Sequence, residues 1–409
     1  MLFNLFQAPL RPMLRSLAHH RVVAALIVLE VALSFAIVAN AMHLIQRLWI
    51  DLNLSTGLPE AELMVAKPRA MKTVEEALAL STEDMRRIRA LPGVHSAAVV
   101  NQVVFGNSSN NSGVNTAPNS GGKRVIAARY EGDEHFIPTL GLRLVDGRNF
   151  KPDEVKTGEE VRTQSSNAAP PVIINRALAE ALFPGKSAVG RAVYWGSSPP
   201  ITVVGVVDVL THTNPKQSDS PYAMIVPVKL SYRDGTYMLR VEPAKQGAVA
   251  KALTQLIPEV DSRRWLVRTQ LLSDMRKDYF AQDRAMVGLL AGVSVALLLV
   301  TAFGIVGLAS FWVEQRRRMI GVRRALGATQ AQIRQYFQAE NALLTGMGVV
   351  VGAVVAMALS QWMAVDKMPL LPWPYLLGGA LLLLALGQLA VLAPARRAAT
   401  LAPASVMRS

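Results

Sequence analysis

A short basic block between two long apolar runs constrains the fold of this chain more than any other feature. Residues 314–340 read EQRRRMIGVRRALGATQAQIRQYFQAE, and the runs 285–312 and 342–365 on either side carry no charged residue. Each run is long enough for a helix across a bilayer core of about 30 Å, which takes roughly 20 residues. The basic block must therefore lie in water at one face of a membrane.

Two further apolar runs bring the number of predicted membrane helices to four. We place these helices at residues 22–48, 285–313, 329–365 and 374–393. A long, mostly polar segment separates the first helix from the second. The sequence thus predicts a membrane protein with four transmembrane α-helices and a large α+β extracytoplasmic domain between helices 1 and 2.

The charge distribution indicates the orientation. A formal net charge of +14 would fit a nucleic-acid-binding protein, but most of the excess lies in the segments 1–21, 314–336 and 394–409. Cytoplasmic segments beside membrane helices are enriched in Lys and Arg. We therefore expect an inner-membrane protein with both termini and the basic loop in the cytoplasm. The large domain and the turn 366–373 are expected in the periplasm, and no nucleic acid is expected as a partner.

The N-terminal region is interpreted as a retained anchor. Residues 1–21 are predicted to form a cytoplasmic amphipathic helix, and residues 394–409 a cytoplasmic tail. The alternative is a cleaved signal peptide, for which Ala39-Asn40-Ala41 offers a small-residue cleavage pattern. The apolar run exceeds the 7–15 residues of a signal core, which favours the anchor. The chain has no cysteine, which excludes disulfides in the exterior domain.

The exterior domain is predicted to consist of a split βαβ-type module with an insertion. Residues 49–106 and 233–284 each show a strand, a helix and a second strand, and we assign them as the two halves of one module. Ser81 followed by Asp84 suggests a variant capping box at the start of the first helix. In the second half, Pro258 is expected to end a helix that begins at Gln246.

The insertion, residues 107–232, is predicted to be β-rich. Within it, the segment 107–122 is rich in Asn, Ser and Gly and is expected to be a mobile loop, ordered only when a partner binds. The polar segment 151–170 is also expected to be a loop. One short helix is predicted over residues 177–183. Strand candidates lie at 125–131, 170–176, 192–196, 201–209 and 222–228.

Motifs for catalysis or metal binding are missing from the sequence. It contains no GxxxxGK[ST] loop, no HExxH and no GxSxG, so we expect no catalytic residue, no bound cofactor and no metal site. Asp133-Glu134-His135 is a possible corner of a metal site, but nothing nearby in the sequence completes it. A solvated turn is the favoured interpretation of these three residues.

One carboxylate lies inside a predicted membrane helix. Glu30 interrupts the first apolar run, and such residues are costly in lipid and often functional. It is interpreted either as a proton-coupling or ion-pairing group or as an interhelical hydrogen-bond partner, and the second reading is favoured. The pairs Gly288 with Gly292 and Gly348 with Gly352 would permit close helix approach.

Local signals divide the basic block into a short helix and a cap. Thr329 and Gln332 form a capping box that starts the third membrane helix, and Gly327 can end the helix before it. A cytoplasmic helix is therefore predicted within residues 314–328. Met319, Val322 and Leu326 would line one of its faces. Partner docking and contact with lipid headgroups are equally compatible with this pattern.

Several segments resemble the MacB/FtsX-type ABC-transporter permeases. The resemblance rests on RRRMIGVRRALGAT with Ile333 and Glu340, and on the C-terminal PARRAATLAPASVMR. The segments HFIPTLGLRLVDGRNF, PVIINRALAEALFPGKSAVGR and TVVGVVDVL are similar to the periplasmic core domain of the MacB branch. The segments occur in the family's order and spacing and extend over most of the chain.

The resemblance implies that the short helix is a coupling helix that seats on a cytoplasmic ATPase. Its motif positions are Met319, Ile320, Gly321, Val322, Arg323, Arg324, Ala325, Leu326 and Gly327. Gly321 would let the partner approach, and Arg323 and Arg324 would meet its acidic groups. Met319 departs from the family, which usually has Glu before Ile-Gly.

The resemblance also implies a function. Relatives of this kind pair with a second permease subunit, as a homodimer or heterodimer, and transmit ATP-driven motion to the periplasm, an action called mechanotransmission. ATP and Mg²⁺ would be bound by the separate ATPase, since no ATPase segment is expected in this chain. Efflux of a peptide, lipid or hydrophobic compound through a periplasmic adaptor and an outer-membrane channel is expected. The alternative is an FtsX-like signalling scaffold that activates a periplasmic enzyme.

Overall fold

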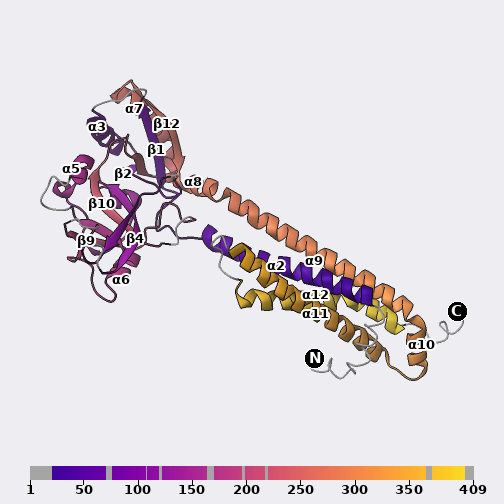
Figure 1. The fold of residues 1–409 in the computed structure, drawn as a ribbon. Helices are drawn as coiled ribbons and strands as arrows, with labels where there is room; N and C mark the ends of the chain where they lie inside the picture. Colours follow the sequence, from indigo (N-terminus) through magenta and orange to yellow (C-terminus); the bar gives the residue numbers. More distant parts are fainter. Residues whose placement is uncertain are drawn as a thin grey trace. The chain divides into compact units, whose positions relative to one another are not determined.

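The chain forms two compact units. The computed structural model describes residues 21–70, 76–106, 108–118, 122–163, 170–195, 199–216, 220–364 and 371–400. Unit 1 comprises Met1–Leu52 and Gln282–Ser409, and unit 2 comprises Asn53–Ala281 (Figure 1). The amphipathic helix expected over residues 1–21 lies outside the described residues apart from Arg21, as does most of the turn 366–373.

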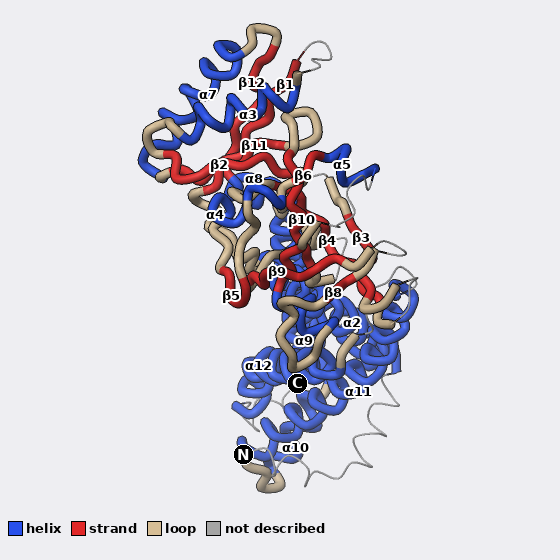
Figure 2. The backbone as a smooth tube through the Cα atoms, turned by 90° about the vertical axis from the view of Figure 1, so that its left-hand side faces the viewer, coloured by secondary structure: helices blue, strands red, loops and turns tan. Residues whose placement is uncertain are grey.

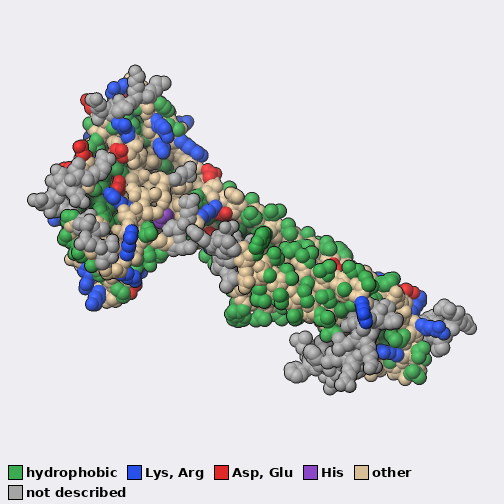
Figure 3. Space-filling model, in the orientation of Figure 1, with side chains coloured by type: hydrophobic (Ala, Val, Ile, Leu, Met, Phe, Trp, Pro, Cys, Tyr) green, Lys and Arg blue, Asp and Glu red, His purple; other side chains and the backbone are tan. Residues whose placement is uncertain are grey.

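Unit 1 contains four helices that are long and apolar enough to cross a membrane. They are α2 (Arg21–Leu52), α9 (Ala281–Gln315), α11 (Gln330–Ala364) and α12 (Trp373–Thr400). Hydrophobic side chains cover most of the helical surface in Figure 3, as expected for helices in contact with lipid. The prediction of four spans is therefore confirmed.

Close packing in unit 1 depends on two glycines of α11. A Cβ atom on Gly348 would lie 2.7 Å from Cβ of Val31, and one on Gly352 would lie 2.6 Å from the carbonyl oxygen of Ala32. The prediction of close approach at this pair is confirmed, because any larger residue would push α11 away from α2. At Gly288 and Gly292 of α9, in contrast, an added Cβ atom would meet no described atom within 4 Å.

The start of the expected tail 394–409 is helical, which corrects the sequence prediction. Pro394 lies inside α12, and the helix continues to Thr400. Proline removes one backbone donor and disfavours a helix interior. Burial offsets this cost, because Ala395, Ala398 and Ala399 pack into an apolar cluster with residues of α9 and α11.

Unit 2 begins with a four-stranded antiparallel sheet in the order β12-β1-β11-β2. These strands are β1 (Leu63–Ala70), β2 (Val94–Val100), β11 (Thr236–Val241) and β12 (Arg264–Leu271). Helix α3 (Ala77–Arg89) joins β1 to β2, and α7 (Gln246–Val260) joins β11 to β12. Each pair of strands is separated by a strand of the other pair, so the predicted split βαβ module is confirmed.

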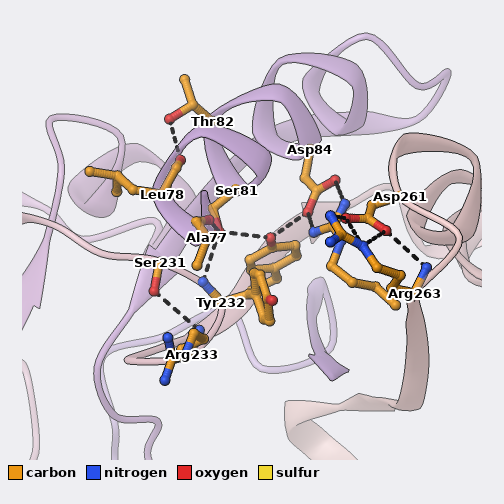
Figure 4. Close-up of polar contacts among 12 residues, drawn as sticks. Ala77, Leu78, Ser81, Thr82, Asp84, Ser231, Tyr232, Arg233, Asp261 and Arg263 are labelled. Carbon is orange, nitrogen blue, oxygen red and sulfur yellow. Dashed lines mark hydrogen bonds and ion pairs between the residues drawn. The ribbon is translucent and has the colours of Figure 1, made fainter. Parts of the chain in front are cut away.

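Two details of this module differ from the prediction. Helix α3 begins at Ala77, so Ser81 and Asp84 lie in its interior and not at its start. The Ser81 hydroxyl donates to the carbonyl oxygen of Ala77 and accepts the N–H of Tyr232, as Figure 4 shows. Helix α7 runs past Pro258 to Val260, because burial of Leu256 and Ile257 in the core stabilises its last turns.

The inserted region forms a mixed sheet in the order β3-β4-β10-β7-β9-β5 (Figure 2). Its central strands are nearly fully buried, as in a sheet covered on both faces. All five predicted strands and the predicted helix are present. The strands are β3 (Asn111–Asn115), β4 (Arg124–Gly132), β5 (Leu144–Gly147), β6 (Lys156–Thr157), β7 (Val172–Asn175), β8 (Ala192–Val193), β9 (Ile201–Val207) and β10 (Ala223–Lys229).

The two segments expected to be loops contain regular structure. In the segment 107–122, β3 pairs antiparallel with β4, and the Asn111 amide oxygen lies 2.7 Å from Nε2 of His212. In the segment 151–170, a turn of 3-10 helix, strand β6 and helix α5 (Gly158–Thr163) follow one another.

Short helices complete the chain. They are α4 (Phe136–Leu140), α6 (Arg176–Leu182), α8 (Leu272–Tyr279), α10 (Arg317–Ala325) and a 3-10 turn at Pro243–Lys245. Helix α6 begins at Arg176, one residue before the predicted start, because the Asn175 side chain accepts the N–H of Leu178 as an N-cap.

Candidate coupling site

Helix α10 is built as the local sequence signals predict. Gly327 takes a φ of +97°, the left-handed conformation that ends a helix. Two residues on, the Thr329 N–H donates to Oε1 of Gln332 at 2.9 Å, and the Gln332 N–H donates to Oγ1 of Thr329 at 3.3 Å. This reciprocal pair is the predicted capping box. α10 is therefore a separate helix between α9 and α11.

The inner face of α10 packs on its own chain. Ile320 is 2% exposed and Gly321 is buried. Ile320 packs with Ile333 and Phe337 of α11 and with the alanines at the end of α12. The expectation that Gly321 admits a partner protein is therefore wrong, since it lies on the face that fixes α10 to unit 1.

The outer face of α10 carries exposed apolar side chains. Met319 is 41% exposed, Val322 is 47% exposed and Leu326 is 83% exposed. We call these three residues the α10 patch. Basic side chains surround it, and Figure 3 shows Lys and Arg gathered at this end of unit 1. An exposed apolar patch with a polar rim is typical of a protein interaction site.

The two arginines expected to meet acidic groups are already engaged within the chain. The guanidinium of Arg323 lies 5.0 Å from the ring centre of Tyr336, a cation–π contact. Arg324 donates from Nη1 to the carbonyl oxygen of Ala399 at 3.0 Å. Arg324 therefore ties α10 to the end of α12, and its contact with an acidic partner stays a prediction.

A buried ion pair that sequence reasoning missed anchors the start of α10. Nη1 of Arg316 lies 2.8 and 3.0 Å from the two carboxylate oxygens of Glu340 in α11. The side chains are 7% and 1% exposed, and the guanidinium also lies 5.3 Å from the ring centre of Trp312. Both residues belong to the segment that resembles the family motif, and this was the available sequence signal. Their spacing in the sequence does not reveal that the two side chains form a contact.

Glu30 lies at the contact between α2 and α9. A Cβ atom on Gly304 would fall 2.3 Å from Oε1 of Glu30, so the carboxylate sits directly on the glycine backbone. One turn further, the hydroxyls of Ser34 and Thr301 lie 2.7 Å apart. Among the described residues no ion pair links Glu30 to a basic side chain. The Glu30 carboxylate thus packs against α9 at Gly304, and its role as an interhelical hydrogen-bond partner stays a prediction.

We expect Gly304→Val to separate α2 from α9. A valine side chain would overlap the Glu30 carboxylate, and overpacking typically costs about 1–3 kcal/mol. Crosslinking between cysteines placed at positions 34 and 301 measures the contact between α2 and α9. Gly307→Val is the control, because a Cβ atom at Gly307 would meet no described atom within 4 Å. Equal crosslinking in both variants would contradict the close contact at Gly304.

The possible metal corner at Asp133, Glu134 and His135 is occupied by a cation of the protein itself. The three ligand atoms lie within 4.8 Å of one another. However, Nη2 of Arg89 lies 3.2 Å from Oδ2 of Asp133, and the His135 ring is within 3.6 Å of both carboxylates. A guanidinium in this position opposes a bound cation, in keeping with the favoured interpretation as a turn.

These features define a class of protein: a multi-pass membrane protein with a large α+β domain outside the membrane and a short helix between two of its spans. Two family models match the chain. The model of the MacB-like periplasmic core domain matches residues 25–256, and the model of the FtsX-like permease C-terminal region matches residues 291–403. The chain belongs to the MacB/FtsX-like family of ABC transporter permeases.

Individual relatives agree with this assignment. YknZ of Bacillus subtilis (strain 168), described as an uncharacterized ABC transporter permease, is 27% identical over 68% of this chain and 68% of its own length. The macrolide export ATP-binding/permease protein MacB of Chromobacterium violaceum is 28% identical over 66% of this chain, which corresponds to 41% of that longer protein. A permease of this family requires an ATPase partner.

Among solved structures, the periplasmic region of MacB from Actinobacillus actinomycetemcomitans matches 56% of this chain and 97% of its own. The sequence identity is 15% and the TM-score is 0.34.

Proposed function

We propose that this chain is the permease subunit that converts ATP hydrolysis by a separate ATPase into a conformational change of its periplasmic domain. The observation that carries the proposal is the two-sided character of α10. Its inner face is fixed to α11 and α12 by Ile320 and by the Arg316–Glu340 pair. Its outer face exposes the α10 patch. A force applied to the patch is therefore passed to the membrane helices.

The connection from α9 to unit 2 supports the same mechanism. Only Phe280 separates α8 from α9 in the sequence. Phe280 is 1% exposed, and its ring lies 4.9 Å from that of Tyr279 and 5.8 Å from that of Phe105, both within unit 2. A displacement of α9 along its axis would thus act on a buried aromatic side chain of the exterior domain.

For the whole assembly we propose export. The cargo would be a peptide, a lipid or a hydrophobic compound taken up outside the inner membrane and passed to a periplasmic adaptor and an outer-membrane channel. A second permease subunit would complete the transporter, and ATP and Mg²⁺ would be bound by the ATPase. Support comes from the relative named for macrolide export, and from the apolar composition of the spans, which offer little to line a polar conduit.

Val322→Asp is the variant that tests coupling. A charge on the exposed patch should weaken docking of the ATPase, because burying one apolar side chain contributes about 1.5–3 kcal/mol and a buried unpaired charge is costly. We expect the stimulation of ATPase activity in lipid nanodiscs to fall at least about tenfold, the ratio that ~1.4 kcal/mol produces.

Gln335→Asp provides the matched control. It adds the same charge to an exposed position at the start of α11, outside the patch. Unchanged stimulation by the Val322→Asp chain would exclude α10 as the coupling helix. A pull-down from the periplasm then separates the two functions: an adaptor with an outer-membrane channel supports export, whereas a periplasmic hydrolase as the main partner supports an FtsX-like signalling scaffold.

A further inference from the structure

A groove of about 880 Å³ opens in unit 2, away from the coupling site. One wall is the face of the four-stranded sheet that carries Lys67 of β1 and Arg268 of β12. A second wall is the connection after β2, with Phe105, and a third is α8, with Tyr279. The volume falls within the range of about 300–1,000 Å³ that is typical of small-molecule sites.

The charges of the groove favour an anion. Two of its cations, Lys67 and Arg233, have no acidic partner among the described residues. Its two carboxylates, in contrast, are engaged. Asp234 accepts the hydroxyl of Ser231 at 2.7 Å. Asp278 accepts the Gln270 amide at 2.8 Å and lies 3.9 Å from Arg268. Neutral donors leave the charges of these carboxylates in place, so the three cations of the lining (Lys67, Arg233 and Arg268) exceed its two carboxylates by one positive charge.

The opposite part of the groove is aromatic and held under backbone strain. Phe105 has a φ of +64°, and it is the single non-glycine residue with a positive φ in the described part of the chain. Its N–H donates to the carbonyl oxygen of Thr213 at 2.9 Å, and its ring lies 5.4 Å from that of Tyr279. Arg276 stacks on the Phe105 ring from a distance of 5.6 Å.

Strain of this kind costs of order 1–3 kcal/mol and is concentrated at ligand sites, where the surrounding structure maintains it. In unit 2 it holds the Phe105 side chain, 5% exposed, directly beneath the wall of the groove. Val103 is 7% exposed and lies beneath the same part, whereas Met275 is half-buried and lines its surface. The groove thus has a cationic part and an apolar, preorganised part.

We propose that the groove binds a small anionic amphiphile, a molecule with one phosphate, sulfate or carboxylate group joined to an apolar body. Lys67 and Arg233 bind the anionic group, and the half-buried Tyr279 and Met275, supported from beneath by Phe105, contact the apolar body. A cationic amphiphile would meet two unpaired positive charges, and a bare anion would leave the aromatic wall in water. The site belongs to unit 2 alone, so it is tested independently of coupling to the ATPase.

The absence of cysteine from the chain provides a direct assay. Thr236 lines the groove and is half-buried, so Thr236→Cys introduces a single reporter thiol. The full chain in lipid nanodiscs is labelled with a membrane-impermeant maleimide, with and without octyl phosphate. We expect octyl phosphate to slow labelling at least about fivefold. Thr254→Cys, exposed on α7 outside the groove, should label at an unchanged rate.

Matched probes and variants test whether binding requires both an anionic group and an apolar body. Octyltrimethylammonium and inorganic phosphate should give no protection. Lys67→Gln with Arg233→Gln in the reporter chain should abolish protection, whereas Arg263→Gln, which breaks an exposed pair with Asp261, should retain it. The proposal is overturned if octyl phosphate fails to protect, if either of the other probes protects equally, or if the double variant is still protected. An unchanged melting temperature of the double variant shows that its fold is intact.

Discussion

A chain carrying Asp84→Asn should lose about 3–5 kcal/mol of the free energy of unfolding of its exterior unit. Asp84 on α3 and Arg264 on β12 form an ion pair at 2.6 Å with both side chains 0% exposed. Removing one charge of such a pair leaves the other buried without compensation. The melting temperature of this unit should fall by roughly 6–20 °C, since each kcal/mol shifts a domain of this size by about 2–4 °C.

The neighbouring tyrosine shows how strongly this centre depends on Asp84. The Tyr237 hydroxyl donates to Oδ2 of Asp84 at 2.5 Å. Burial, together with the Asp84 charge, holds the pKa of Tyr237 well above its usual value, so the hydroxyl remains a donor throughout the neutral range. Asp84→Asn therefore weakens two interactions at once.

The double variant Asp84→Leu with Arg264→Met is the control for this prediction. Apolar residues of similar volume can replace a buried ion pair with little loss, so we expect most of the stability to return. The melting temperature of the exterior unit, measured in both variants through its susceptibility to protease, gives the result. A loss below about 1 kcal/mol for Asp84→Asn would show that the pair is not buried as described.

The second large effect is expected at the end of unit 1 that carries α10. Glu340→Gln should remove the carboxylate that compensates the buried Arg316 charge, with a cost of about 3–5 kcal/mol for the position of α10. We expect ATPase stimulation to fall by at least about tenfold, as the coupling helix loses its fixed attachment to α11. Stimulation measured in nanodiscs with the partner ATPase gives the result.

A similar but exposed ion pair provides the comparison. Glu314 and Arg317 lie 3.1 Å apart with side chains 71% and 46% exposed, and surface pairs of this kind contribute little. Glu314→Gln should therefore leave stimulation nearly unchanged. If both variants behaved alike, burial of the Arg316–Glu340 pair would have no role in coupling.

The sequence predicts those parts of the structure that local signals determine. Four apolar runs indicate the membrane helices, and Gly327 with the Thr329–Gln332 box indicates the boundary between α10 and α11. The alternating strands and two helix–strand units indicate the split module. In each of these cases the information lies within a few residues along the chain.

The sequence does not reveal interactions between distant residues. Asp84 and Arg264 are 180 positions apart, and a charged residue in an amphipathic helix ordinarily faces water. The local pattern therefore suggests a cap at Asp84, which is wrong. Likewise, nothing near Arg324 in the sequence indicates that the end of α12 returns to this residue. Strand β3 is missed because its composition, Asn-Ser-Gly-Val-Asn, is that of a loop.

The contact between Arg324 and Ala399 has a practical consequence. The last turn of α12 holds α10, the helix that the ATPase is proposed to contact, in its position. A bulky fusion or affinity tag that unwinds this turn would weaken the attachment of α10 without contacting the α10 patch. The ATPase turnover of protein tagged at the C-terminus should therefore be compared with that of untagged protein. A low turnover of the tagged protein alone would then be assigned to the tag and not to the choice of cargo.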